Sequence, residues 1–481
     1  MSEERYMGES VMNAEKREKI YRKAPTYQWF CSLVITLICT GIFFNMWYSF
    51  VSVNNQTGHL LGTANLLMST IIYLVVVIYV MNMTGGYKIG VNQTMNIISS
   101  QVVALCVVNI IELIVSLAIL GEIRFFVVLL VRYILVWVIE SIIIGLLTFL
   151  MVHMYIMLFP PLKMLEVMGT RKNTLSVKIN RRDDKYNVCK RISFAEDDES
   201  IIREIQKYDA VLLNDLPSED KNRILKICYK VNKRVYFTPK LSDIIAKSSK
   251  EVNLFDTPLY LSENTDMSLS QRAVKRLFDI ALSGISLIIL SPILILVAIA
   301  IKLNDGGSVF YRQERVTFGG KKFWILKFRS MIEDAEKDGK PHPAGENDDR
   351  ITKVGKVIRA TRVDELPQLI NILAGDMSIV GPRPERVEHV EKYENDIPEF
   401  VFRTKVKGGL TGYAQVYGKY NTTALDKLKL DMIYILNYSF RLDLQIIFET
   451  VKVIFQKEST EGFDEGGQHE MQEYASGKEK K

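Results

Sequence analysis

Four long apolar segments follow one another in the first third of the chain. They cover residues 29–51, 60–83, about 97–120 and 125–159. A bilayer-spanning helix needs roughly 20 apolar residues, and each segment reaches or exceeds that length. The pattern predicts an α-helical four-helix transmembrane bundle within residues 28–160. Lysine and arginine crowd both flanks of this region, so the positive-inside rule places the N-terminal segment, residues 1–27, and the chain after the fourth helix in the cytosol.

Three ionisable residues, Glu112, Arg132 and Glu140, lie inside these apolar segments. Such residues often mark a functional site, because an unpaired charge in the bilayer is costly. The alternative is an interhelical contact that only fixes packing. We favour packing, since Arg132 and Glu140 are eight residues apart on one helix face and could share a partner or a water. No transport pathway is inferred.

Residues 161–268 have the composition of a small cytosolic domain. β-rich runs at 175–179, 210–214 and 234–238 alternate with helical patterns at 200–207 and 219–231. This predicts an α/β (Rossmann-like) domain. It has no GxGxxG turn after a strand, which argues against dinucleotide binding. A regulatory or oligomerising role is the expected one.

A fifth apolar run, residues 280–303, is interrupted by Ser291 and Pro292. Its length suits a spanning helix, but both of its flanks are rich in lysine and arginine. A re-entrant helix at about 278–303 that breaks at Ser291 and Pro292, enters one leaflet and returns satisfies both signals. The alternative is a Pro-kinked crossing, which would place the following residues outside the cell. Residues 457–481 are rich in Glu, Gly, Gln and Lys and are predicted to be a disordered tail.

Composition limits the remaining function classes. The chain of 481 residues carries 61 basic and 55 acidic residues, a net charge of +6 that gives no argument for nucleic-acid binding. The five cysteines form no CxxC pair and no His is spaced for a zinc site, so neither a disulfide scaffold nor structural zinc is expected. Any chemistry must come from a local site.

Adjacent carboxylates at Asp364 and Glu365 are the first candidate for that site. Apolar residues repeat at helical spacing after them, and Pro367 is tolerated only in a first turn, so the pair lies at or just before a helix N-terminus. Such a position can hold phosphate, and two acids there could share a divalent cation. An ionised aspartate can also attack phosphorus directly. The alternative is a capping Asp followed by a first-turn Glu.

Basic residues supply the second candidate. Residues 311–331 alternate apolar and basic side chains, which predicts strands with cations, including Lys327 and Arg329, on one face. Arg383 lies between Pro382 and Pro384, whose rings stiffen the backbone that presents the guanidinium. A pre-aimed arginine suits a phosphate or a nucleotide. A solvated face and a rigid surface turn are the respective alternatives.

These residues carry a family resemblance. From about residue 275 to 455 the chain resembles the bacterial sugar transferase family, the monotopic phosphoglycosyl transferases. The matching stretches are KRLFDIALS, the SP break, FYRQERV, KFRSM, DRITKVGKVIR, DELPQLINILAGDMSIVGPRPE, GLTGYAQV and LDLQIIFETV. The preceding membrane helices and α/β domain are similar to the long form, typified by undecaprenyl-phosphate galactose or glucose phosphotransferases. Gly408, where proline is common, and Ser330, where threonine is usual, are the departures.

The resemblance implies an α/β-type phosphoglycosyl transferase domain at 269–456 on the cytosolic face of the bacterial inner membrane. The implied reaction moves a hexose 1-phosphate from a UDP-sugar, with galactose or glucose favoured, to undecaprenyl phosphate and releases UMP. It starts exopolysaccharide, capsule or O-antigen synthesis and requires Mg²⁺.

By the same resemblance, Asp364 would carry the phosphosugar covalently and Glu365 would hold magnesium. The turn at Pro382, Arg383 and Pro384 would face the uridine nucleotide. Lys327, Arg329 and Arg359 would face the diphosphate. The expected partners are the donor, the acceptor, the lipid bilayer and a second copy in a homodimer. Two alternatives are a non-catalytic scaffold of a polysaccharide assembly complex, which would not need the Asp-Glu pair, and a transporter, which the position of the motifs outside the four helices disfavours.

Overall fold

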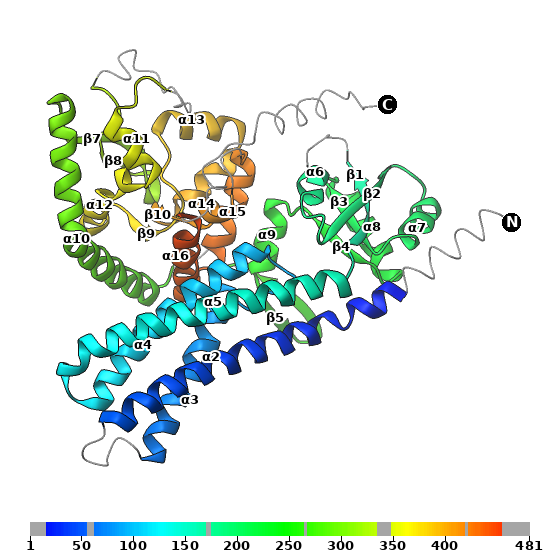
Figure 1. Cartoon of the computed structure of the whole chain (residues 1–481). Coiled ribbons are helices and arrows are strands. Elements are labelled where there is room, and N and C mark those ends of the chain that lie inside the picture. The colour runs from blue at the N-terminus through cyan, green and yellow to red at the C-terminus, as the bar shows by residue number, and fades with distance from the viewer. Residues whose placement is uncertain are drawn as a thin grey trace. The chain divides into compact units, whose positions relative to one another are not determined.

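The computed structural model describes residues 16–54, 62–169, 175–263, 267–333, 348–418 and 422–454. They belong to two compact units, the first reaching to Thr238 and the second beginning at Pro239 (Figure 1). The predicted tail at 457–481 and residues 1–15 of the predicted N-terminal segment lie outside the described residues.

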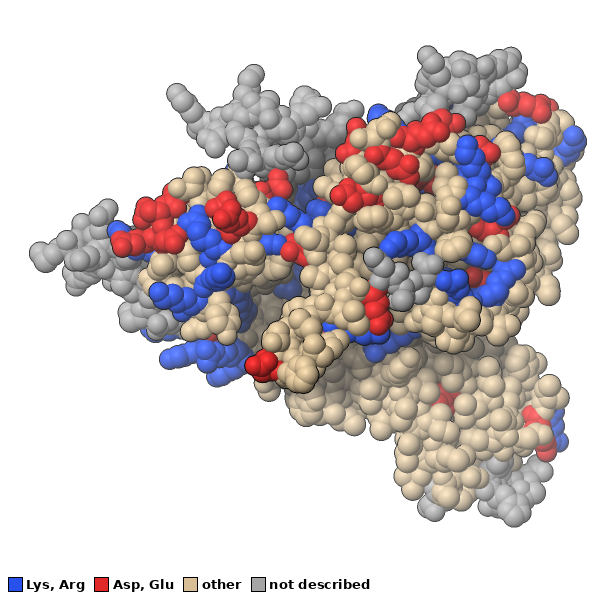
Figure 2. All heavy atoms as spheres, turned by 180° about the vertical axis from the view of Figure 1, so that it is seen from behind, with Lys and Arg blue, Asp and Glu red and all other residues tan. Residues whose placement is uncertain are grey.

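Four long apolar helices open the first unit, as the sequence predicts. They are α2 (Ala24–Asn54), α3 (Thr63–Thr84), α4 (Thr94–Leu120) and α5 (Phe126–Leu158), with a single 3-10 turn, η1 (Ile123–Phe125), before the last. Each is long and apolar enough to cross a membrane. In Figure 2 the surface of these helices, at the lower right, carries few charged side chains. Lipid rather than water suits such a surface, and the chain is a multi-pass membrane protein.

Glu140 fixes the packing of three of these helices. Its carboxylate accepts hydrogen bonds from the Tyr73 hydroxyl at 2.6 Å and from the Asn109 amide at 2.8 Å, which joins α5 to α3 and α4. Arg132 does not share these partners, because its guanidinium lies over the Phe50 ring, 5.1 Å from the centroid. Glu112 is fully buried, and its carboxylate oxygens have no hydrogen-bond partner within the described residues. The packing role is thus carried by Glu140 and not by a pair with Arg132.

A four-stranded parallel sheet completes the first unit. The strand order is β2-β1-β3-β4, from β1 (Leu162–Met168), β2 (Tyr186–Ser193), β3 (Ala210–Asn214) and β4 (Arg234–Phe237). The predicted strands at 210–214 and 234–238 are confirmed, as are the helices now seen as α7 (Asp198–Gln206) and α8 (Ser218–Lys230).

The predicted strand at 175–179 is wrong. These residues form helix α6 (Leu175–Asn180). Because β1 and β2 pair in parallel, the chain between them must return along the sheet, and a helix is the usual crossover. Local β-branched content could not reveal that constraint.

The second unit begins with α9 (Leu241–Ser248) and a hairpin of β5 (Lys250–Leu254) and β6 (Thr257–Leu261). By their contacts these elements belong to the second unit. Ile244 of α9 packs in one apolar cluster with Leu428 and Met432 of α15 (Ala424–Leu436). Helix α15 therefore turns its apolar side chains Leu428 and Met432 to the protein core.

Helix α10 (Leu269–Asp305) is the fifth helix long and apolar enough to cross a membrane. The predicted break at Ser291 and Pro292 is not a break, because one helix continues through both residues. Pro292 has no N–H to donate to the carbonyl of Ile288. The Ser291 hydroxyl donates to that carbonyl instead, at 2.8 Å. The helix bends within its length (Figure 1) without losing its continuity.

The first turns of α10 are bound tightly to the rest of the second unit. Lys275 donates to Asp443 at 2.6 Å, and both side chains are buried. Arg276 donates to two carbonyls at the end of α12 (Gln368–Ala374). Asp279 accepts from the hydroxyl of Ser378 and the backbone N–H of Ile379. These buried polar contacts fix the start of α10 on the folded unit.

Short elements around one apolar core make up the remainder. A hairpin of β7 (Phe310–Val316) and β8 (Lys322–Phe328) turns through η2 (Phe318–Gly320), and β9 (Ser378–Val380) pairs in parallel with β10 (Gly409–Thr411). The other elements are α11 (Lys353–Ala360), η3 (Val363–Glu365), α13 (Val387–Asp396), η4 (Pro398–Lys405), α14 (Tyr413–Tyr417) and α16 (Phe440–Ile454). The basic segment at 311–331 does form strands. However, Lys322 is exposed while Lys327 is only 17% exposed, so its cations do not share one face.

Candidate active site

Asp364 and Glu365 lie in the single 3-10 turn η3, directly between α11 and α12. Arg362, just before this turn, has a left-handed backbone with φ of 59°. A bulky side chain rarely adopts that conformation, which costs on the order of 1 kcal/mol or more and is typical of functional sites. The left-handed backbone at Arg362 changes the chain direction after α11, so that both carboxylates lie just before α12. The prediction that the pair precedes a helix is confirmed.

Glu365 is held by two cations from distant parts of the sequence. Its Oε1 accepts from Lys327 Nζ at 2.9 Å and from Arg383 Nη2 at 2.6 Å, while Arg383 Nη1 lies 3.4 Å from Oε2. The Glu365 side chain is 12% exposed. Burial alone would raise its pKa, but the charges of Arg383 and Lys327 hold the pKa of Glu365 well below its usual range. Glu365 is therefore an ionised carboxylate locked in position.

Asp364 has the opposite environment. Within the described part of the chain, its carboxylate accepts no hydrogen bond and forms no ion pair. Burial and the neighbouring charge of Glu365 raise the pKa of Asp364, while Lys327, Arg359 and Arg362 act in the other direction. An aspartate without hydrogen-bond donors is available to react, since no partner must be displaced first.

The turn that carries Arg383 is fixed from behind. Arg403 donates to the backbone carbonyl of Arg383 at 3.0 Å and to Asp431 at 2.6 Å, and the side chains of Arg403 and Asp431 are 5% and 1% exposed. Arg315 donates to the carbonyl of Pro384 at 3.1 Å. Gly381 packs so closely that a Cβ there would lie 2.3 Å from the carbonyl oxygen of Lys407. Arg383 is thus aimed by tertiary contacts as well as by its flanking prolines.

Arg403, Asp431 and Arg315 were not among the sequence-predicted site residues. Each is one charged residue within an unremarkable helix or strand pattern, and no local spacing links them to Arg383. A small hollow beside the turn is lined by residues including Thr317, Pro382 and Gly408. Pro382, Arg383 and Pro384 also line this small hollow.

The remaining predicted residues divide into two groups. Arg359 is close enough to lower the pKa of Asp364, and no hydrogen bond of its side chain to another described residue is present. Arg329 is placed differently, because its guanidinium binds Asp305 and the carbonyl of Ser308 and its side chain is 6% exposed. Ser291 and Pro292 lie within α10 and make no contact with the carboxylates.

The donor set of this site is compatible with magnesium bound together with phosphate. No group of three or more His, Cys, Asp or Glu side chains gathers to hold a metal among the residues that the structure describes. Magnesium commonly takes only one or two protein carboxylates and completes its shell with water and substrate phosphates. Among the described residues, Glu365 Oε2 has only the 3.4 Å contact to Arg383, so one carboxylate oxygen is available for such a shell.

Comparisons with known proteins agree on the family. The model of the family described as "Bacterial sugar transferase" matches residues 270–457. A UDP-glucose:undecaprenyl-phosphate glucose-1-phosphate transferase of Klebsiella pneumoniae is 43% identical over 220 residues, which cover 44% of this chain and 45% of the relative. A UDP-N-acetylgalactosamine-undecaprenyl-phosphate N-acetylgalactosaminephosphotransferase of Aeromonas hydrophila is 37% identical over 52% of this chain and 59% of its own.

A shorter relative is covered more completely. The exopolysaccharide production protein ExoY of Rhizobium meliloti is 36% identical over 194 residues, which are 37% of this chain and 84% of that protein. By contrast, the chain spans about half the length of the first two relatives. The matched region contains the free aspartate, the clamped glutamate and the Arg383 turn. The chain therefore belongs to the bacterial sugar transferase family.

Proposed function

We propose that this protein transfers a hexose 1-phosphate from a UDP-sugar to undecaprenyl phosphate, releasing UMP and starting the synthesis of an exopolysaccharide, capsule or O-antigen. The observation that carries the proposal is the pair of adjacent carboxylates with opposite environments, one free and one held by two cations. The relatives of Klebsiella pneumoniae and Aeromonas hydrophila carry out this class of reaction with glucose and N-acetylgalactosamine, according to their names.

The donor half-reaction begins when an Asp364 oxygen attacks the phosphorus that bears the sugar. A bond forms between that oxygen and phosphorus, and the bond from phosphorus to the bridging oxygen of UMP breaks, so UMP leaves with the electron pair. In the second half-reaction an oxygen of undecaprenyl phosphate attacks the same phosphorus and the Asp364 carboxylate leaves. No proton or electron is gained or lost overall, and each displacement uses one large substrate at a time.

The surrounding cations have separate roles in this proposal. Arg383 and Lys327 lie beside Glu365 and would face the phosphates of the donor, with Arg359 nearby. The turn of Pro382, Arg383 and Pro384, which Arg403 and Arg315 hold in place, would face the uridine nucleotide. Glu365 would hold magnesium, which when bound supplies positive charge that neutralises the diphosphate. Arg329 is left out of this set, because its guanidinium is already fully used.

The test is UMP release by the full chain held in lipid nanodiscs, with undecaprenyl phosphate, Mg²⁺ and a panel of UDP-sugars. Release with one donor, dependent on the acceptor, is the expected result and names the sugar. Glucose and galactose are the favoured donors. Folded protein that releases no UMP with any donor would contradict the proposal.

Because the pKa of Asp364 is raised, the rate of UMP release should begin to fall at a higher pH than an ordinary aspartate would give. Attack needs the ionised carboxylate, so activity should be lost as pH falls through a value above the ordinary aspartate pKa of about 3.9. Arg359 lowers that pKa, and Arg359→Gln should therefore move the acid limb to higher pH. Lys356→Gln, on the exposed face of the same helix, is the control. The measurement is the pH profile of UMP release, and an unmoved limb in the Arg359 variant would contradict the assignment.

We also propose that α10 is re-entrant and that the catalytic unit lies on the cytosolic face. A straight helix of 37 residues would extend about 55 Å, well beyond the roughly 30 Å hydrocarbon core. Both ends of the bent helix are bound to the same folded unit, at Lys275 and at Asp305, which supports a return to the side of entry.

Cysteine labelling tests this topology. Phe310→Cys, in a variant whose five native cysteines are replaced, should be inaccessible to a membrane-impermeant maleimide added outside intact cells and become accessible after lysis. Labelling from outside would establish a crossing helix. A homodimer stays a prediction, checked by the mass of the nanodisc-held protein.

A further inference from the structure

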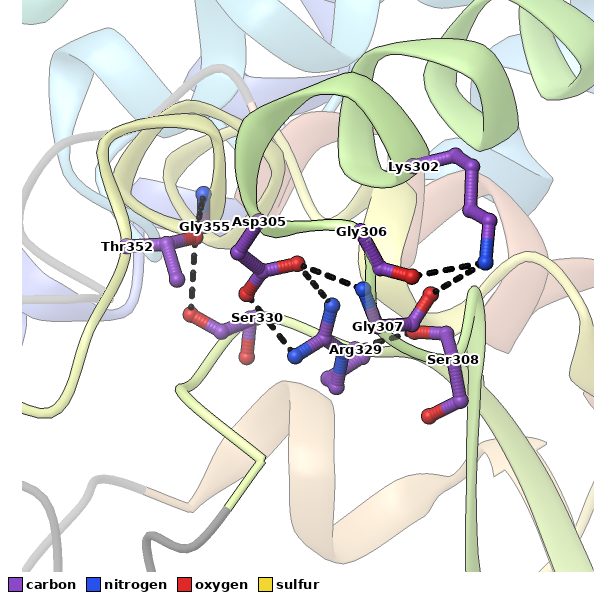
Figure 3. Close-up of polar contacts among 9 residues, drawn as sticks. All are labelled: Lys302, Asp305, Gly306, Gly307, Ser308, Arg329, Ser330, Thr352 and Gly355. Atoms are coloured by element: carbon purple, nitrogen blue, oxygen red, sulfur yellow. Dashed lines mark hydrogen bonds and ion pairs between the residues drawn. The ribbon is translucent and has the colours of Figure 1, made fainter.

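Arg329 forms a clamp with the last residue of the membrane helix α10. Its Nη1 donates to Asp305 Oδ2 at 2.9 Å, its Nη2 donates to Asp305 Oδ1, and its Nε donates to the carbonyl of Ser308 at 2.6 Å (Figure 3). The guanidinium thereby uses all three of its nitrogens. Asp305 is 29% exposed and Arg329 only 6%, so the pair is shielded from water mainly on the arginine side.

The backbone at the end of α10 packs closely around the Arg329–Asp305 pair. Gly306 ends α10 with a left-handed backbone, and Lys302 donates to the carbonyl of Gly306 at 2.7 Å. A Cβ at Gly307 would lie 2.7 Å from the Arg329 Nη2, so no side chain fits there without moving the guanidinium. The Gly307 N–H also donates to Asp305 Oδ1 at 3.2 Å. The end of α10 is thus fixed to Arg329 by backbone and side-chain contacts together.

Ser330, which follows Arg329, contacts the helix that leads to Asp364. The carbonyl of Ser330 accepts from the Thr352 N–H at 3.1 Å, and a Cβ at Gly355 would lie 1.9 Å from the same oxygen. The Thr352 hydroxyl caps α11 by accepting from the Gly355 N–H at 2.9 Å (Figure 3). Helix α11 then leads directly into the η3 turn of Asp364.

Apolar packing runs beside this polar chain. Ile301 near the end of α10 is buried in one cluster with Phe328 of β8 and Ile358 of α11, and Val363 of the η3 turn packs against them. Lys327, which holds Glu365, is the neighbour of Phe328 on the same strand. The end of the membrane helix is therefore in direct contact with both segments that place the two carboxylates.

We propose that the Arg329–Asp305 clamp positions Asp364 at the level of the acceptor phosphate at the bilayer surface. The inference rests on the proposed function. Arg329 is a positioning residue here, since it touches neither carboxylate. The donor is water-soluble and reaches the site from the cytosol, whereas the acceptor phosphate is held at the depth set by its lipid chain. Loosening the link between α10 and α11 therefore impairs the second half-reaction selectively.

Asp305→Asn removes the charge of the clamp, and Arg329→Lys keeps the positive charge but loses the fork and the Ser308 contact. The matched control is Lys321→Gln, from the Lys321–Asp376 pair at 3.9 Å, whose side chains are 72% and 32% exposed. Each protein is placed in nanodiscs and its thermal unfolding is recorded. The donor half-reaction is measured as UMP released by one turnover without acceptor, and the complete reaction as steady-state UMP release with undecaprenyl phosphate.

For both clamp variants the donor half-reaction should stay within about threefold of the natural protein, and the complete reaction should fall about tenfold or more, as expected for a small displacement of reacting groups. The loss should shrink when a short-chain polyprenyl phosphate is supplied in detergent micelles, where the phosphate is not held at a fixed depth. The control should change neither rate.

An equal loss in both half-reactions, or no loss in either, would overturn the clamp proposal. Unfolding of both clamp variants would overturn it as well, because the pair would then be a folding requirement and not a positioning contact. Failure of the proposed function looks different, since the natural protein itself would release no UMP.

Discussion

Replacing Asp364 by asparagine should reduce UMP release at least about a thousandfold, because an amide cannot take the place of the attacking carboxylate oxygen. Both half-reactions should be lost together, since the same oxygen forms and then breaks the bond to phosphorus. The measurement is single-turnover and steady-state UMP release in nanodiscs. Asp376→Asn, the same substitution on a side chain that is 32% exposed, should leave both rates unchanged.

The same variant should be no less stable than the natural protein. The pKa of Asp364 is raised in the folded state, so its contribution to stability is present at low pH and is lost as pH rises from the ordinary aspartate value of about 3.9 through the folded value. At neutral pH the charge therefore opposes folding, and a neutral asparagine removes that cost. Thermal unfolding at pH 7 should show an equal or higher midpoint. A markedly lower midpoint together with residual turnover would mean that Asp364 is a capping residue and not the nucleophile.

Glu365→Gln should cause the second largest loss, and it should affect stability as well as rate. The variant leaves Lys327 and Arg383, which are 17% and 35% exposed, without their anionic partner. Breaking a buried ion pair costs about 3–5 kcal/mol, and the partial exposure of Arg383 reduces this to about 2–3 kcal/mol. UMP release should fall about 100-fold or more, because the two cations lose the contact that positions them.

The pH dependence gives a second readout of this pair. The pKa of Glu365 is held well below its usual range, so its stabilising effect is present above the unfolded value of about 4.3 and is lost as pH falls toward the folded value. The gap in unfolding midpoint between the natural protein and the Gln variant should therefore narrow in acid. Glu365→Asp keeps the charge on a shorter side chain. Its unfolding midpoint should therefore lie between those of the Gln variant and the natural protein. A Gln variant as stable as the natural protein at pH 7 would show that Lys327 and Arg383 do not depend on Glu365.

The local sequence pattern was enough to predict several elements. The four apolar runs predict α2 to α5 because burial in lipid demands length and continuous apolarity, which are both local properties. The strand at 210–214 and the helices at 200–207 and 219–231 follow from periodicity in the same way. The strand predicted at 175–179 failed because only the parallel pairing of β1 and β2 makes that segment a crossover helix.

The candidate site shows the same division. Asp364 and Glu365 stand next to each other in the sequence, and the helical spacing after them predicts their place before α12. The residues that give the two carboxylates different environments are distant in the sequence. Lys327 and Arg383 are 38 and 18 residues from Glu365, and no periodicity indicates that both turn to the same carboxylate while Asp364 stays free.

The sequence by itself determined the membrane helices, the adjacent Asp364–Glu365 pair and the family, because apolar length, adjacent residue types and motifs are properties of contiguous chain. Only the tertiary structure decided the partners of each charge. It assigned Arg329 to Asp305, and it bound the Arg383 turn to Arg403. A guanidinium has the same chemistry toward a carboxylate as toward a phosphate, so which of them it meets depends on long-range packing and cannot be deduced from the residues beside it.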